Sequence, residues 1–156
     1  MKLRVLAVGR KMPAWVDTGF AEYARRMPRT MPVALIEVKP ADRARGGTAA
    51  QWRAVEMQRI RAALSADGAS VVLDERGELP TTADLARRLE RWRREARDVA
   101  FIIGGVDGTA RELQREADWL LALSRFTLPH GLARVLLAEQ LYRAVSLLAG
   151  HPYHRE

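Results

Sequence analysis

Short runs of aliphatic residues alternate along the chain with longer segments whose apolar residues recur every three or four positions. Strands are predicted over residues 3–8, 33–38, 70–74, 99–105 and 119–124. Helices are predicted over residues 13–27, 48–65, 81–97, 109–118 and 129–149. Because this alternation is typical of a parallel sheet covered by helices, the sequence predicts one α/β domain over residues 1–156, without a linker or an internal repeat.

The last predicted helix is apolar nearly all round. One side carries Leu132, Leu136 and Leu147, and the other carries Leu137, Leu141, Val145 and Leu148. A helix of this kind is normally buried on both sides. We expect one side to pack on the sheet and the other to meet a second subunit in a homodimer, with Leu137 and Leu148 facing outward.

Composition narrows the class of protein. The chain has 156 residues, of which 48% are hydrophobic and 29% charged, which excludes disordered and fibrous classes. It has no cysteine, so disulfides and cysteine-ligated metal sites are excluded and a reducing compartment is the natural setting. No secretory signal or membrane-spanning run is found, and we expect a cytoplasmic protein.

The net charge is +7, and the first 40 residues hold eight basic and three acidic groups. A basic balance favours partners that carry phosphate, and here it points to the N-terminal part of the chain. However, 23 of the 26 basic residues are arginine. The bias of a GC-rich genome would produce this composition without any selection for RNA binding, so both explanations stay open.

Two loops follow predicted strands at the edge where open α/β sheets place ligands. They are IGGVDG at 103–108 and LDERG at 73–77. The glycines of the first could let the backbone approach a nucleotide-like ligand. The loop matches neither GxGxxG nor the GK[ST] phosphate loop, and a simple tight turn would explain it equally well.

All three histidines lie near the C-terminus, at His130, His151 and His154. A metal site needs at least three converging ligands, and Pro152 argues against a helix that would align the last two, so we expect no metal. The tail HPYHRE nevertheless combines groups that can stack, hydrogen-bond and transfer protons. A solvated chain end is the alternative interpretation.

Three segments together carry a more specific signal. FIIGGVDG (101–108), LALSRFTLPHGLARVLLAEQLYRA (121–144) and GHPYHRE (150–156) resemble the bacterial ribosomal RNA large-subunit methyltransferase H family of the SPOUT superfamily. The resemblance extends over the full length. It implies a C-terminal trefoil knot within about residues 70–150 that holds S-adenosylmethionine, and two subunits that complete each active site. The implied reaction is methylation of N3 of the pseudouridine at position 1915 of 23S rRNA, in helix 69 of the assembled ribosome.

The resemblance also assigns roles to residues. It implies cofactor contacts at Leu73, Gly104, Leu123, Ser124, Arg125, Phe126, Thr127 and Leu128, where a side chain at position 104 is expected to block the cofactor's approach. It gives target recognition to the tail, where Tyr153 would stack on or orient the base and His154 would accept the proton. Candidates for phosphate or base contact are Arg134, Arg143 and Arg155.

Two alternatives to this interpretation remain open from the sequence alone. An ordinary Rossmann methyltransferase would carry an acidic residue and a glycine-rich loop after its first strand, but that strand here ends in Val8-Gly9-Arg10. A non-catalytic ribosome-binding factor would keep the fold and the charge without the chemistry. Binding of S-adenosylmethionine by the purified protein distinguishes this second alternative from an enzyme.

Overall fold

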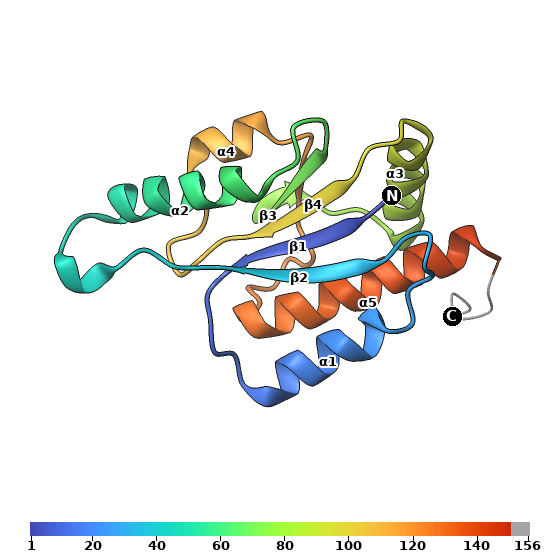
Figure 1. Ribbon diagram of the computed structural model, residues 1–156, viewed down its shortest axis with the longest axis horizontal. Helices are drawn as coiled ribbons and strands as arrows, with labels where there is room; N and C mark the ends of the chain where they lie inside the picture. Colours follow the sequence, from blue (N-terminus) through green and yellow to red (C-terminus); the bar gives the residue numbers. More distant parts are fainter. Residues whose placement is uncertain (151–156) are drawn as a thin grey trace.

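The computed structural model describes residues 1–150 and contains a five-stranded parallel sheet with strand order β2-β1-β4-β3-β5 (Figure 1). The strands are β1 (Leu3–Val8), β2 (Val33–Val38), β3 (Ala69–Glu78), β4 (Val99–Ile103) and β5 (Trp119–Leu121). The predicted α/β class is confirmed. The first two strands match their predicted bounds, while the third is longer than predicted and the last two are shorter.

Helices cover both faces of the sheet (Figure 1). Their bounds are α1 (Ala14–Ala24), α2 (Ala49–Ala63), α3 (Thr82–Arg94), α4 (Arg111–Glu116) and α5 (His130–Leu148), with a short 3-10 helix, η1, at Arg43–Arg45. One core lies between the sheet and α1, α3 and α5, and a second lies between the sheet and α2 and α4. Because both faces are covered, the strands read as continuous aliphatic runs instead of alternating patterns.

Local sequence signals define where the two longest surface helices begin. Thr48 precedes α2 and Thr81 precedes α3, and each side chain accepts a hydrogen bond from the backbone N–H three residues later. In turn, the side chains of Gln51 and Asp84 accept hydrogen bonds from the backbone N–H groups of Thr48 and Thr81, which completes a capping box at each site.

The packing of α5 differs from the sequence-based expectation. Leu137 and Leu141 are fully buried, and Val145 nearly so, in the core of their own chain. Both α1 and α3 pack against α5, so these two helices cover the flanks that we assigned in part to a second subunit. The prediction that Leu137 faces outward is therefore wrong, whereas Leu148 is exposed as expected.

A bulge interrupts β3 beside the end of β5. Leu73 and Glu78 both pair with Leu121, so residues 74–77 leave the regular register between these two pairings. The Glu78 carbonyl accepts a hydrogen bond from the Ala122 N–H at 2.8 Å, which holds the chain against β5 after the bulge. At Gly77 a Cβ would lie 2.7 Å from the Leu120 carbonyl oxygen, so only glycine fits this crossing.

The parallel arrangement brings the loops after β1, β4 and β3 to one edge of the sheet. Within the described residues no helix is both long enough and apolar enough to cross a membrane.

Candidate functional site

A cavity of about 520 Å³ lies at the carboxyl ends of β3, β4 and β5. Its walls come from residues 73–76 in the β3 bulge, from residues 103–108 and from the segment after β5, with His130 and Ala133 of α5 closing it. This volume is within the range of small-molecule and cofactor sites. Residues 73–77, expected as a loop after a strand, form instead a bulge within β3, and residues from both selected segments line one cavity.

Seven of the eight residues expected to contact a cofactor line this cavity. They are Leu73, Gly104, Leu123, Ser124, Phe126, Thr127 and Leu128. Arg125 is exposed and is absent from the lining. The structure therefore brings together segments that lie about 50 residues apart in sequence, and leaves one predicted side chain outside.

The glycine loop of residues 104–108 folds back on itself. The Gly108 N–H donates to the Gly105 carbonyl at 3.0 Å, and Gly108 has a left-handed φ of 74°. At Gly104 a Cβ would lie 2.7 Å from the Gly108 carbonyl carbon and 2.9 Å from the Thr109 methyl carbon. Gly104 is thus required for closure of the loop itself, a different reason from the expected clash with a ligand.

A buried carboxylate supports the glycine loop from behind. Glu56 of α2 is 2% exposed, and its Oε1 accepts a hydrogen bond from the Ala41 N–H at 2.9 Å. Its Oε2 has no hydrogen-bond partner among the described residues and lies 3.1 Å from the position of a Cβ at Gly105. Arg43 of η1 bonds the Asp107 carboxylate at 2.6 Å and so ties η1 to the same loop. Sequence reasoning missed these residues, because nothing in their spacing marks them.

Acidic side chains dominate the charge around the cavity. Asp74, Glu75 and Asp107 line it together with one arginine, Arg76. Hydrogen bonds from the Arg76 side chain and backbone lower the pKa of Asp74, and Gln114 also donates to it at 3.0 Å. Asp74 is therefore ionised near neutral pH and is held in a fixed position.

His130 joins the first turn of α5 to the glycine loop, because its ring hydrogen-bonds the Gly104 backbone. Burial, with a smaller effect from the neighbouring Arg134 charge, lowers the pKa of His130, while the Gly104 bond and Glu37 act in the opposite direction. Its Nε2 is buried without a partner among the described residues. The ring is therefore neutral near pH 7 and orients the loop.

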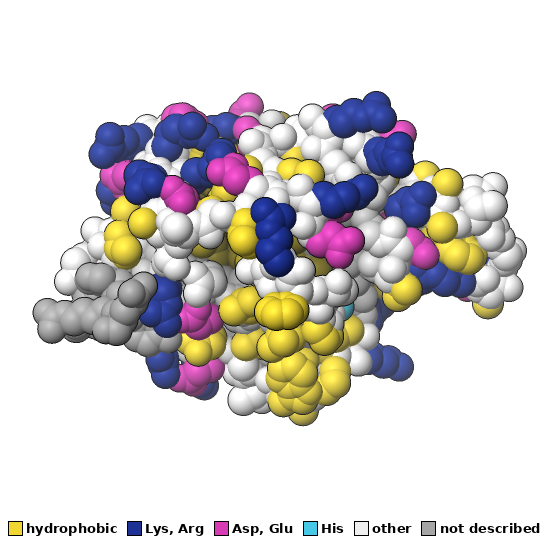
Figure 2. All heavy atoms as spheres, turned by 180° about the vertical axis from the view of Figure 1, so that it is seen from behind, with side chains coloured by type: hydrophobic (Ala, Val, Ile, Leu, Met, Phe, Trp, Pro, Cys, Tyr) yellow, Lys and Arg dark blue, Asp and Glu magenta, His cyan; other side chains and the backbone are white. Residues whose placement is uncertain are grey.

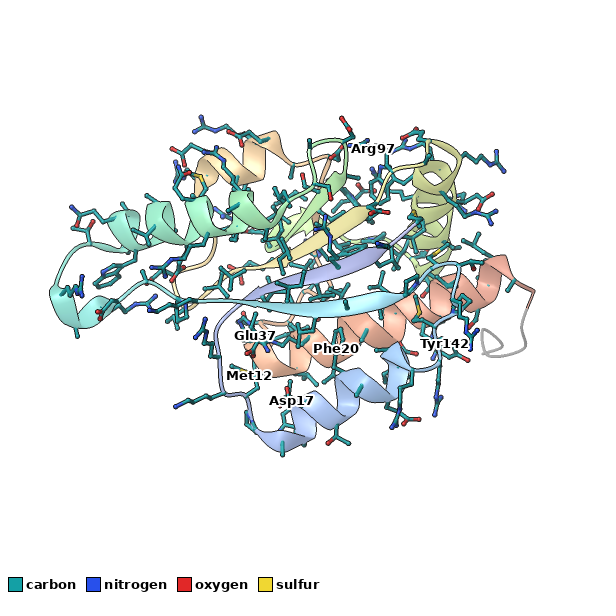
Figure 3. All side chains as sticks on the ribbon, viewed as in Figure 1. Met12, Asp17, Phe20, Glu37, Arg97 and Tyr142 are labelled. Carbon is teal, nitrogen blue, oxygen red and sulfur yellow. The ribbon has the colours of Figure 1, made fainter. Side chains whose placement is uncertain are left out.

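Arg134 does not occupy the surface position that an RNA contact requires. Its side chain is 0% exposed, and its guanidinium donates to Glu37 Oε1 at 2.9 Å and to the Gly9 carbonyl at 3.3 Å. Figure 3 shows Glu37 on β2 near the start of α5. This buried ion pair connects α5 to the ends of β1 and β2, which corrects the expectation of an exposed RNA ligand.

The other expected substrate residues are separate from this cluster. Arg143 lies on α5 and is paired with Glu139 one turn earlier, at 2.7 Å. Tyr153, His154 and Arg155 lie outside the described residues. Among the described residues, no group of three or more histidine or acidic side chains could hold a metal ion.

Comparison with known proteins identifies the family. The family model described as "Predicted SPOUT methyltransferase" matches residues 1–154. The chain belongs to this methyltransferase family. It is therefore an enzyme, and its methyl donor is S-adenosylmethionine.

Named relatives are similar over the whole chain. A Laribacter hongkongensis protein called ribosomal RNA large subunit methyltransferase H is 56% identical, with 100% of both chains covered. A Dechloromonas aromatica protein of the same name is 55% identical, with 100% of this chain and 99% of its own covered.

Solved structures share the fold at low sequence identity. A probable methylase family protein from Haemophilus influenzae matches 95% of this chain and 66% of its own, with a TM-score of 0.59 and 14% identity. A probable methyltransferase from Bordetella pertussis matches 92% and 93%, with a TM-score of 0.56 and 15% identity. At this identity the likeness shows the fold alone.

The lowered pKa of His130 predicts a pH-dependent stability. The unfolded histidine titrates near 6.5 and the folded one below that value, so the stabilisation is complete above about pH 6.5 and is lost as the pH falls toward the folded pKa. Thermal unfolding between about pH 7.5 and pH 5 should show a steeper decline for the wild type than for His130→Asn. Identical slopes for the two proteins would contradict the assignment.

Proposed function

We propose that this protein transfers a methyl group from S-adenosylmethionine to N3 of the pseudouridine at position 1915 of 23S rRNA, within the assembled ribosome. The observation that carries the proposal is identity above 50%, over whole chains, to proteins named ribosomal RNA large subunit methyltransferase H. A ribosomal substrate also implies a cytoplasmic location.

The cavity has the chemistry that this cofactor requires. Ile103, Leu121, Leu123 and Leu128 provide apolar wall area suited to an adenine ring. The carboxylates of Asp74, Glu75 and Asp107 suit the positive charges of the sulfonium and the amino group. When bound, S-adenosylmethionine supplies an electron-poor methyl group, and we assign its binding to Leu73, Gly104 and the segment 123–128.

The trefoil knot is part of the proposal. Residues 74–77 bulge away from β5, and Glu78 returns to bond the chain directly after β5. This crossing, with the backbone approach at Gly77, supports a chain path in which the segment after β5 passes beneath the bulge.

Methyl transfer requires alignment of the two reactants and removal of one proton. The new bond joins N3 to the methyl carbon, the bond from that carbon to sulfur breaks, and the N3 proton leaves to a base. We assign orientation of the target base to Tyr153, proton acceptance to His154, and phosphate or base contacts to Arg143 and Arg155. Arg134 is left out of this set because it is buried.

A second subunit is proposed to complete the site. Exposed apolar side chains lie around the start of α5: Trp15 is 56% exposed, Leu132 41% and Phe126 83%. The starts of α1 and α5 touch, since a Cβ at Gly131 would lie 2.8 Å from Val16. Figure 2 shows apolar side chains gathered on the lower part of one face. Such a patch is typical of a protein interface.

The homodimer proposal predicts that a charge in this patch separates the subunits. Leu132→Glu should lower the mass in light scattering from about twice 17.5 kDa to 17.5 kDa, because the interface would bury an unpaired carboxylate. Val55→Glu is the matched control, since Val55 is 43% exposed on α2, across the sheet. A wild-type monomer with full activity would refute the proposal.

The roles given to the tail predict a separation of cofactor binding from catalysis. A chain ending at Gly150 should fold and bind S-adenosylmethionine but transfer no labelled methyl to ribosomes from a strain that lacks this modification. His154→Ala should reduce the rate most at low pH and recover partly as the pH rises, because the N3 imide then ionises unaided.

Normal methylation by the truncated chain would remove the tail from the mechanism.

A further inference from the structure

The loop after β1 presents two cations on a fixed backbone. The Gly9 N–H donates to the Val38 carbonyl at 3.0 Å, and the Gly9 carbonyl accepts from buried Arg134 at 3.3 Å. Met12 packs inward: its methyl carbon lies 3.7 Å from the position of a Cβ at Gly9, and Figure 3 shows it near the start of α1. Arg10 and Lys11, between these anchors, are exposed.

This loop lies beside the cavity. Val8, the last residue of β1, lies 3.0 Å from the position of a Cβ at Gly105 in the glycine loop. The His130 ring lies 3.9 Å from the position of a Cβ at Gly9. Because Gly105 and His130 both line the cavity, the loop forms part of its surroundings.

Arg10 and Lys11 differ from most basic residues of the chain in having no acidic partner among residues 1–150. Arginines on the exposed face of α3, such as Arg87 and Arg93, are instead paired with carboxylates one turn away. Paired cations contribute little net potential, whereas two adjacent unpaired ones attract an anion. Lys39 and Arg125, which follow β2 and β5 at the same edge, are also exposed and have no acidic partner among the described residues.

The backbone of Lys11 is held in an unfavourable conformation. Its φ is 56°, and the other non-glycine residue with a positive φ in the described chain is Ala96, at 55°. Glycine adopts this left-handed conformation without steric cost, whereas a residue with a Cβ does not. Strained residues of this kind concentrate at functional sites. The presence of lysine at this position, where glycine would be less strained, therefore indicates a function for its side chain.

We propose that Arg10 and Lys11 bind backbone phosphates of the RNA that presents the target base to the cavity. The inference rests on the proposed function for the identity of the RNA. Two adjacent cations fixed to a rigid loop would set the position of the RNA without reading its sequence. Neither Arg10 nor Lys11 lines the cavity, so the proposed contact serves RNA docking and not cofactor binding.

The test compares variants of equal charge. Arg10→Ala/Lys11→Ala removes both cations, and Lys2→Ala/Arg29→Ala removes two exposed cations that precede β1 and β2 at the opposite edge of the sheet. Lys11→Gly removes the side chain while relieving the backbone, and Ala96→Gly is its control at the second left-handed position. The probe is the 70S ribosome from a strain lacking the methyl group, titrated at several salt concentrations.

The Arg10/Lys11 double variant should bind ribosomes about tenfold more weakly, and its plot of log affinity against log salt should be less steep by about 2, since each phosphate contact contributes about 0.9. The KM for ribosomes should rise while kcat at saturation and affinity for S-adenosylmethionine stay unchanged. Lys11→Gly should weaken binding with an equal or higher Tm. The two control variants should bind ribosomes as the wild type does.

Ribosome affinity and salt dependence equal to those of the wild type would overturn the proposal. An equal loss of affinity for S-adenosylmethionine in the double variant would also overturn it, because the substitutions would then have disturbed the structure of the cavity. If the wild type binds ribosomes without methylating them and the double variant loses that binding, the docking surface stands while the proposed reaction fails. A wild type that binds no ribosomes contradicts both.

Discussion

The buried guanidinium of Arg134 holds the start of α5 against the ends of β1 and β2. Placing a cation where none of its surface meets water costs several kcal/mol unless partners offset it. Glu37 and the Gly9 carbonyl are those partners, one from β2 and one from the loop after β1. The segment before α5, the His130 ring and the Arg10–Lys11 loop are all positioned by this anchor. Each of them borders the cavity or lies beside it.

From this anchor the site extends through close backbone contacts. His130 bonds the Gly104 backbone, and Gly104 lets its loop turn back on Gly108. Gly77 allows an equally close approach between the β3 bulge and the chain around β5. The cavity is therefore shaped largely by backbone, while carboxylates at its rim set its charge. This combination suits a cationic cofactor with a flat ring.

Much of this architecture could be predicted from sequence. Aliphatic runs located the strands and apolar residues at helical spacing located the helices closely, because both signals are local. The positions of the two ligand loops followed from the parallel topology. Arg134 was misplaced because an arginine in a helix is exposed by default, and only the tertiary structure shows the carboxylate and carbonyl around it. Likewise, apolar residues all round α5 indicated burial on every side without distinguishing α1 and α3 from a second subunit.

Calorimetric titration of the purified protein with S-adenosylmethionine tests the central claim, that this cavity is the cofactor site of a methyltransferase. We expect binding of about one equivalent per subunit and an increase in Tm at saturation, because a ligand that binds only the folded state stabilises it. Gly104→Val should lose that binding, since its side chain cannot fit against Gly108. If the wild-type protein gives no binding heat and no rise in Tm, this cavity is not the site of S-adenosylmethionine.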